Sequence, residues 1–322
     1  MSEAVGRASG KVILFGEHAV VYGVPAIAVG IDRGAHATAR PAALGAASTL
    51  ELGGRTFEAR ACGEPDLGLA LHALLAATGI SPTVHVQARA DLPPGGGLGC
   101  SAALGVAIGR AVCHITGQDD EAAQARASAW EGVFHGNPSG VDTAAAALGG
   151  CLRYVRGEGI ARVSPARDLW LAIGQTGVPS STRAMVEGVA RIRNRQPGTF
   201  EQTLTAFRTL VDNARLAIES GDAKAVGQLM DLSQMLLSGW MLSTEGVETL
   251  CRAARDAGAL GAKLTGAGGG GCIVALADDA VDGEAAAARI VAAYKAVGFD
   301  GFVARVSRRG GTDDGAGSER AS

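Results

Sequence analysis

The chain has 322 residues, of which 47% are hydrophobic and 19% are charged. This balance is typical of a globular protein and excludes a disordered one, and the length is enough for two domains that share a cleft. The 29 basic and 32 acidic residues leave a formal net charge of −3, which gives no sign of a nucleic-acid or membrane partner. The N-terminus lacks a signal-peptide core, and the six cysteines show no CxxC spacing. We therefore expect a soluble, cytoplasmic protein without a zinc ribbon or disulfide framework.

The first half of the chain is predicted to mix strands with helices. Short apolar or alternating runs indicate strands at 11–15, 24–31, 48–60, 83–89, 150–155 and 169–174. Helical spacing indicates helices at about 100–116, 119–134 and 141–148. A Gly-Asn-Pro-Ser-Gly turn separates the last two helices.

The second half is richer in predicted helices. Four helical patterns come first, at about 181–195, 199–219, 222–238 and 245–257. One more helix, at about 283–296, is then predicted between two strands at 272–276 and 301–307. Because the order is mixed and not a regular β-α-β alternation, we expect an α+β fold. We place one domain at 1–165, a second at 166–309, and a disordered, Gly/Ser/Asp-rich tail at 310–322.

Residues 93–103 form the most informative segment, Pro-Pro-Gly-Gly-Gly-Leu-Gly-Cys-Ser-Ala-Ala. Glycines let backbone N–H groups close on a ligand, and the helix that begins here adds its unpaired N–H groups and its positive dipole end. This combination predicts a cradle for a di- or triphosphate, with Ser101 placed to reach a phosphate-bound Mg2+. No Gly-Lys-Ser/Thr closes the segment, so it is not a P-loop and a cation must come from elsewhere. A tight turn with a helix cap is the structural alternative.

A second glycine run, residues 265–272, reads Thr-Gly-Ala-Gly-Gly-Gly-Gly-Cys. Gly266, Gly268 and Gly271 match the G-x-G-x-x-G pattern, but an apolar strand and not a helix follows, which argues against a nicotinamide enzyme. We expect this loop to approach the ligand that the first loop holds. A purely structural turn is the alternative.

Two carboxylates, Glu131 and Asp142, flank the turn at 136–140. One lies near a predicted helix end and the other at the next helix start, so they can converge on a cation such as Mg2+. A solvated helix residue and an N-cap would have the same spacing, and the spacing alone favours neither interpretation.

Four other polar residues in or near these motif segments are candidate site residues. Lys11 and Lys263 are two of only four lysines, and a compact ammonium suits a phosphate or substrate oxygen. Glu17 and His18 follow a predicted buried strand, where either a site or a simple turn would place polar residues.

Three segments together resemble the GHMP kinase superfamily: 11–23, 93–103 and 263–272. They occur in the family's order at suitable intervals and span nearly the whole chain up to the tail. Within the superfamily, Gly-Glu-His-Ala-Val-Val-Tyr-Gly at 16–23 and His-Gly-Asn-Pro-Ser-Gly-Val-Asp at 135–142 are most similar to mevalonate kinases, as is Ser-Ser-Thr-Arg at 180–183. The Asp-Tyr pair that galactokinases carry after Gly-Glu-His is absent.

The resemblance implies a two-domain GHMP kinase fold with an ATP and substrate cleft between the domains. It also implies ATP- and Mg2+-dependent phosphorylation of the primary hydroxyl of (R)-mevalonate, at the entry to isoprenoid synthesis. Its partners would be these small molecules, with no nucleic acid and no membrane, and a homodimer is left open. Competing interpretations are another small-molecule kinase of the superfamily, for phosphomevalonate or a sugar, and a non-catalytic ligand sensor.

By motif position, the resemblance assigns a role to each candidate residue. Asp142 would accept the proton of the substrate hydroxyl, Lys11 would lower the pKa of that hydroxyl, and Ser101 with Glu131 would hold Mg2+. The substrate side would include Glu17, His18, Tyr154 and Thr182. The ATP phosphates would be wrapped by Pro93, Pro94, Gly95, Gly96, Gly97, Leu98, Gly99, Cys100, Ser101, Ala102 and Ala103.

The chain departs from the family at one loop position, where Cys100 replaces the first residue of the usual Ser pair. The helix N-terminus predicts a stabilised thiolate there, and hence the most reactive thiol of the chain. The neighbouring Ser101 is retained, so the departure does not put the metal-binding hydroxyl in doubt.

Overall fold

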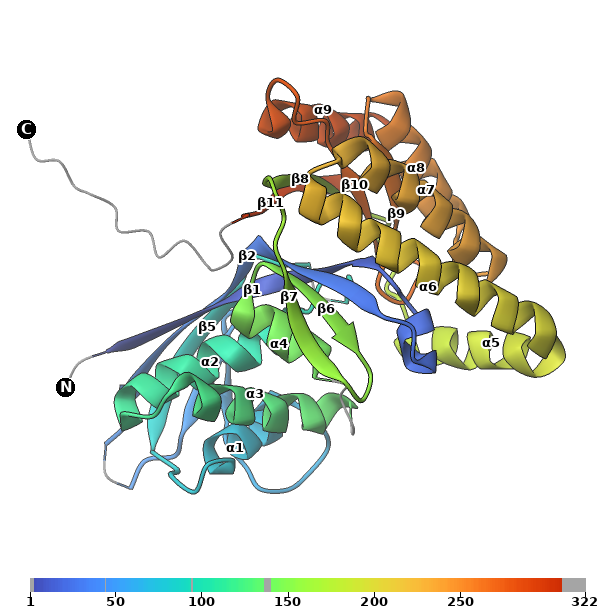
Figure 1. The fold of residues 1–322 in the computed structure, drawn as a ribbon. Helices are drawn as coiled ribbons and strands as arrows, with labels where there is room; N and C mark the ends of the chain where they lie inside the picture. The colour runs from blue at the N-terminus through green and yellow to red at the C-terminus, as the bar shows by residue number, and fades with distance from the viewer. Residues whose placement is uncertain (1–2, 44, 94, 136–139, 309–322) are drawn as a thin grey trace, which may run out of the picture.

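The computed structural model describes residues 3–43, 45–93, 95–135 and 140–308. The strands of these residues form two β-sheets (Figure 1). The first sheet has the order β4-β3-β5-β2-β6-β7, with β1 also paired to β2. Its strands are β1 (Ala4–Phe15), β2 (Ala26–Pro41), β3 (Thr49–Leu52), β4 (Arg55–Glu58), β5 (Val84–Ala90), β6 (Cys151–Val155) and β7 (Gly159–Val163). All pairs are antiparallel except β3 with β5.

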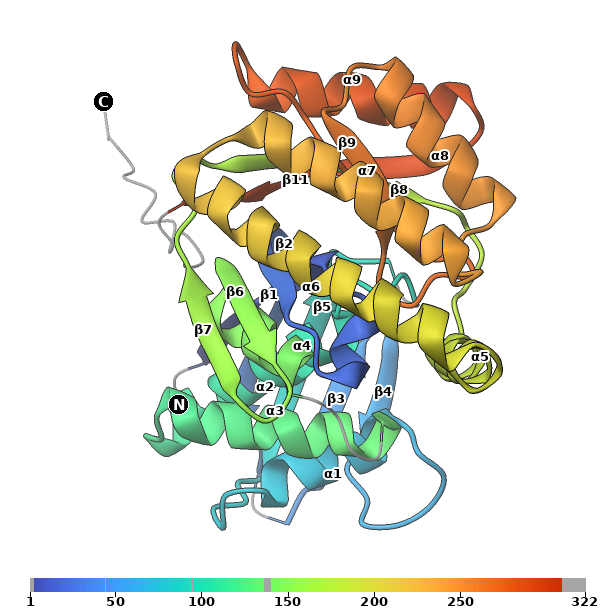
Figure 2. The same ribbon diagram turned by 45° about the vertical axis from the view of Figure 1, so that its right-hand side comes forward.

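Helices cover one face of this sheet, with α2 packed on β1 and β2 (Figures 1 and 2). They are α1 (Leu67–Ala76), α2 (Cys100–Thr116), α3 (Asp120–His135) and α4 (Val141–Leu148), and a short 3-10 helix, η1 (Ala19–Tyr22), follows β1. The α2 helix is bounded by two glycines in the left-handed region, Gly99 at φ 70° and Gly117 at φ 68°. Since this conformation disfavours other residues, the two glycines fix where the helix starts and stops.

The second sheet has the antiparallel order β11-β8-β10-β9. Its strands are β8 (Leu169–Gln175), β9 (Gly261–Thr265), β10 (Cys272–Leu276) and β11 (Asp300–Val306). The helices of this half are α5 (Thr182–Arg195), α6 (Pro197–Ser220), α7 (Ala223–Gly239), α8 (Glu245–Asp256) and α9 (Gly283–Ala296). Figure 2 shows α7, α8 and α9 against the second sheet, and the long α6 beside α7, where it also contacts β2 and β7 of the first sheet.

Hydrogen bonds between β1 and β9 connect the two sheets. The backbone N–H of Ile13 donates to the Thr265 hydroxyl over 3.1 Å, and this hydroxyl donates to the Ile13 carbonyl over 3.0 Å. These bonds pin the strand of the first sheet that carries Lys11 against the second glycine loop.

No helix of the described residues is long and apolar enough to cross a bilayer.

The mixed α+β fold predicted from the sequence is confirmed, and most predicted elements are present within a few residues. The sequence did not reveal α1, β7 or β9, and β1 and β2 extend well beyond their predicted ranges. The predicted disordered tail lies outside the described residues.

Candidate active site

A cavity of about 620 Å³ lies where the two sheets meet. Its walls come from β1, the starts of α2 and α4, the end of α3, the turn before α5 and the second glycine loop. Sites for small molecules have volumes of about 300–1,000 Å³, so this cavity is large enough for a nucleotide and part of a second ligand. Both predicted glycine segments and most of the predicted polar residues line it.

The first glycine loop follows a left-handed backbone at Gly95, Gly97 and Gly99, where φ is 71°, 76° and 70°. It leads directly into α2, whose first N–H groups have no partner within the helix. A Cβ built on Gly266 would lie 3.4 Å from the Gly97 Cα, so the two glycine loops touch backbone to backbone. The second loop therefore closes on the first loop itself, as well as lining the same cavity.

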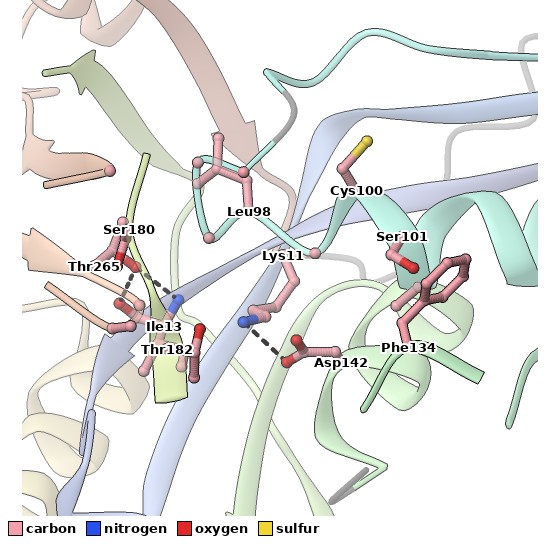
Figure 3. Close-up of a pocket in the computed structure, with 18 of the residues that line it drawn as sticks. Lys11, Ile13, Leu98, Cys100, Ser101, Phe134, Asp142, Ser180, Thr182 and Thr265 are labelled. Atoms are coloured by element: carbon pink, nitrogen blue, oxygen red, sulfur yellow. Dashed lines mark hydrogen bonds and ion pairs between the residues drawn. The ribbon is translucent and has the colours of Figure 1, made fainter. Parts of the chain in front are cut away.

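Lys11 and Asp142 form an ion pair inside this cavity (Figure 3). Lys11 Nζ lies 2.9 Å from Asp142 Oδ1. The Lys11 backbone N–H donates to the Leu98 carbonyl over 2.9 Å, and a Cβ at Gly99 would lie 3.2 Å from the Lys11 Cβ. The ammonium is thus fixed by the glycine loop. Asp142 lies in the first turn of α4, whose N-cap is Gly140 and not Asp142.

Ser101 and Glu131 are brought together from α2 and α3. The Ser101 hydroxyl donates to Glu131 Oε1 and accepts a hydrogen bond from Trp130 Nε1 over 3.3 Å. Glu131 is buried, with 3% of its surface exposed. A buried carboxylate next to a hydroxyl is a pair of hard oxygen ligands, and this pair fits Mg2+ completed by phosphate oxygens and water.

Glu17 and His18 are buried at the turn after β1, and both contact the second sheet's half of the chain. Glu17 Oε1 accepts a hydrogen bond from Lys263 Nζ, and both side chains are fully buried. Burial raises the pKa of Glu17 and lowers the pKa of Lys263, while their mutual attraction opposes both shifts. Glu17 Oε2 has no hydrogen-bond partner among the described residues. His18 Nε2 lies 2.7 Å from the Ala267 carbonyl oxygen, and burial lowers the pKa of this imidazole.

His18 also has an unusual backbone, with φ at 57°. A non-glycine residue in this region costs of order 1–3 kcal/mol and persists only where the surroundings enforce it. Here the hydrogen bond to Ala267 and the burial of the ring supply that constraint.

The structure separates the remaining predicted site residues. Thr182 lines the cavity at the start of α5, whereas Tyr154 does not. Tyr154 packs instead with Val141 and other apolar residues of a small cluster beside α4. Ala103 is buried in the core beneath the loop, and Pro94 lies outside the described residues. The other predicted loop residues line the cavity.

The surroundings of Cys100 oppose the predicted activation of its thiol. Burial raises the pKa of its thiol, and the carboxylate of Glu131 raises it further. In Figure 3 the Cys100 sulfur points away from the Lys11–Asp142 pair. All six cysteines are free thiols, and Cys62 is the exposed one.

Two aromatic side chains in the cavity wall were missed by the sequence analysis. Trp130 and Phe134 pack edge to face on α3, with ring centroids 5.8 Å apart. They are four positions apart on α3, which places them on the same face of the helix. That spacing was the available signal. Ser180, whose hydroxyl donates to the Gly268 carbonyl over 2.5 Å, lines the cavity as well.

Comparisons with known proteins agree with this geometry. The GHMP kinase N-terminal domain model matches residues 67–150, and the GHMP kinase C-terminal model matches residues 214–296. The mevalonate kinase of Aeropyrum pernix is 37% identical over 285 residues, covering 85% of this chain and 88% of the relative. That of Thermococcus sibiricus is 33% identical over 331 residues, covering 95% and 97%.

A solved structure gives the same result in three dimensions. The crystal structure of L. major mevalonate kinase in complex with R-mevalonate matches with a TM-score of 0.79 and 30% identity. The match covers 95% of this chain and 96% of that one. The similarity thus extends across both sheets and the cavity between them.

Proposed function

Because this chain belongs to the mevalonate kinase family of GHMP kinases, we propose that it transfers the γ-phosphate of ATP to the primary hydroxyl of (R)-mevalonate. The products would be 5-phosphomevalonate and ADP. The observation that carries the proposal is the Lys11–Asp142 pair, which lies in one cavity with the glycine loop and the Ser101–Glu131 pair.

ATP would bind with its phosphates on the first glycine loop. The N-terminus of α2 directs unpaired N–H groups and the positive end of the helix dipole at this point. The left-handed glycines Gly95, Gly97 and Gly99 let the backbone approach the phosphates without side chains in the way. Phosphoryl transfer depends mainly on positioning and electrostatic stabilisation, and a preorganised backbone provides both.

Lys11 and Asp142 would act on the acceptor. Asp142 is the partly exposed member of the pair, so its carboxylate can accept the proton of the mevalonate hydroxyl. Lys11, held by Leu98 and Gly99, would lower the pKa of that hydroxyl and stabilise charge that develops on the transferring group.

Ser101 and Glu131 would hold Mg2+ with the ATP oxygens. When bound, Mg2+ would neutralise phosphate charge and help to align the γ-phosphate with the acceptor. The hydrogen bond between the two side chains and the burial of Glu131 support this assignment.

Glu17, His18 and Thr182 would form the substrate side. Glu17 Oε2, buried and without a described partner, can accept a hydrogen bond from a substrate hydroxyl. Lys263 compensates the charge of this carboxylate from behind. Tyr154 would act indirectly, because it packs against Val141 at the start of α4.

We extend the proposal to domains at 1–165 and 166–309. The last strand of the first sheet ends at Val163 and the first strand of the second begins at Leu169. A cytoplasmic location fits both the use of ATP and six free thiols.

A coupled ADP-release assay over (R)-mevalonate, phosphomevalonate, homoserine and galactose tests the proposal. We expect turnover with mevalonate to exceed that with each of the others by at least about a hundredfold, the discrimination available to a site that hydrogen-bonds its substrate. Preferred turnover of phosphomevalonate or galactose would assign the chain to a rival kinase activity. Binding of ATP without turnover of any acceptor would indicate a ligand sensor.

A further inference from the structure

A second cavity, of about 260 Å³, lies at another junction of the two sheets. Its walls come from β1, β2 and β11, with Gly150 before β6 and Ser307 after β11. It shares no lining residue with the candidate active site.

An irregularity in the β1–β2 pairing builds this cavity. Ser9 pairs with Gly34 and the next residue, Gly10, pairs with Ile31, so Asp32 and Arg33 are extra residues on β2. Both turn toward β11: Asp32 Oδ1 accepts from the Arg305 backbone N–H over 2.9 Å, and Arg33 Nε donates to the Val303 carbonyl over 3.3 Å. Such bulges re-aim side chains and recur next to functional sites.

Basic side chains dominate the lining of the cavity. Arg7, Arg33 and Arg305 line it against a single carboxylate, Asp32. Arg305 is already paired with Asp168 at 2.6 Å. Neither Arg7 nor Arg33 has an ion-pair partner in the part of the chain that the structure describes, and Arg33 lies 4.6 Å from the centroid of the Phe302 ring.

A hydroxyl and an imidazole also line the cavity. Ser9 is only 6% exposed, and its hydroxyl makes no hydrogen bond within the described ranges of the chain. His36 is the cross-strand neighbour of Arg7 and lies 3.9 Å from Asp91. Burial lowers the pKa of His36, as do Arg89 and Arg7, so the neutral ring offers one N–H donor.

We propose that this cavity, which we call the junction site, binds a phosphoryl anion, either inorganic phosphate or the phosphate of a small monoester. Arg7, Arg33, Ser9 and His36 present donors from two strands, which suits the several oxygens of a tetrahedral anion better than a planar carboxylate. The volume lies below the usual range for drug-sized ligands and so suits a phosphate with a short chain. The four donors lie on β1 and β2, and Arg33 also donates to the Val303 carbonyl of β11, so an anion here would lie beside a contact between the two sheets.

An NMR titration of the full ¹⁵N-labelled chain tests the proposal. The active site is first saturated with Mg2+ and a non-hydrolysable ATP analogue, so that its glycine loop is covered. Inorganic phosphate and glycerol 3-phosphate are then titrated separately. We expect saturable shifts of the Arg7, Ser9 and His36 amides. Equal affinities would identify inorganic phosphate as sufficient, and tighter binding of the ester would indicate a phosphorylated metabolite.

Three variants make the test specific. Loss of a charged hydrogen-bond donor in Arg7→Gln should weaken binding about tenfold, and Ser9→Ala, which loses a neutral one, about threefold. Arg208→Gln, which removes an exposed arginine on α6, serves as the matched control and should bind as the unaltered chain does. Shifts that do not saturate, or equal weakening in Arg208→Gln and Arg7→Gln, would overturn the proposal. The readout is independent of mevalonate turnover, so its failure would leave the proposed kinase activity intact.

Discussion

Lys11 and Asp142 are an ion pair of unequal burial: the lysine side chain is 4% exposed and the aspartate 45%. The buried member is fixed by β1 and by the glycine loop, whereas the carboxylate faces the cavity. A fixed cation next to an accessible carboxylate is suited to proton transfer from a bound hydroxyl.

Asp142→Asn should therefore retain the fold and ATP binding while kcat for mevalonate falls by about 10²–10⁴-fold, the range of general-base catalysis. Asp120→Asn is the matched control, because Asp120 also lies in the first turn of a helix and faces a cation, Arg110. Steady-state kinetics and an ATP-binding titration measure both effects. Near-normal kcat in Asp142→Asn would rule out the assigned base.

Ser101→Ala and Glu131→Gln should raise the Mg2+ concentration needed for half-maximal activity, with a smaller effect on KM for mevalonate. Loss of a metal ligand or its orienting partner typically costs about 10–100-fold in metal affinity. Ser128→Ala removes an exposed hydroxyl from α3 and should leave the Mg2+ titration unchanged. Unaltered Mg2+ titrations in both site variants would contradict the metal assignment.

Lys263→Met should lower the free energy of unfolding by about 3–5 kcal/mol, because it leaves the Glu17 carboxylate buried without its cation. Glu17→Gln in the same chain should restore much of this loss. Lys224→Met, at an exposed position of α7, is the control. Denaturant unfolding of the four chains gives the comparison, and a double variant as unstable as Lys263→Met would refute the explanation.

The same variant should show a defined pH dependence. Burial raises the pKa of Glu17 in the folded state above its unfolded value, so the folded state binds the proton more tightly. The free energy of unfolding therefore falls as pH rises between the unfolded and folded pKa values of Glu17. A carboxyl group whose pKa is raised by folding can change stability with pH only in this direction. The loss in the free energy of unfolding caused by Lys263→Met should thus be smaller at pH 5 than at pH 8. A deficit that grows toward acid would show that Glu17 is not the group responsible.

Alkylation should modify Cys62 before Cys100. Cys62 is exposed, whereas burial and the Glu131 carboxylate raise the pKa of Cys100 and lower its thiolate fraction at neutral pH. Peptide mapping after brief treatment with iodoacetamide decides the order. Cys62→Ser should remove the fast phase of labelling, and faster modification of Cys100 would show that the helix dipole outweighs burial.

The features predictable from sequence were those in contiguous motifs. The glycine loop, Lys11 and Ser101 were predicted to share one site from residue type and motif position, and the structure places all three in the wall of one cavity. The α1 helix was missed because its ten residues, Leu67–Ala76, are apolar almost throughout and show little helical periodicity. The β9 strand was missed because it carries the buried Lys263, whose charge disguises a fully buried strand.

The features that escaped prediction depend on contacts distant in sequence. The buried partner of Glu17 belongs to the other sheet, so no local pattern reveals it. The pKa of Cys100 is set by burial and by Glu131, which lies on another helix. Tyr154 lies behind α4 because of its register on β6, opposite Ala26, and this register was not available from the sequence.

The Glu17–Lys263 pair also limits how early in synthesis the two halves of the chain can come together. The two residues are 246 positions apart, so at ~5–20 residues per second the lysine is synthesised roughly 12–50 s after the glutamate. Throughout that interval the nascent chain holds a carboxylate destined for a dry interior without the cation that will accompany it there. The cavity between the two sheets is also lined by Thr265 and Gly271, so it cannot assemble until most of the chain has been synthesised.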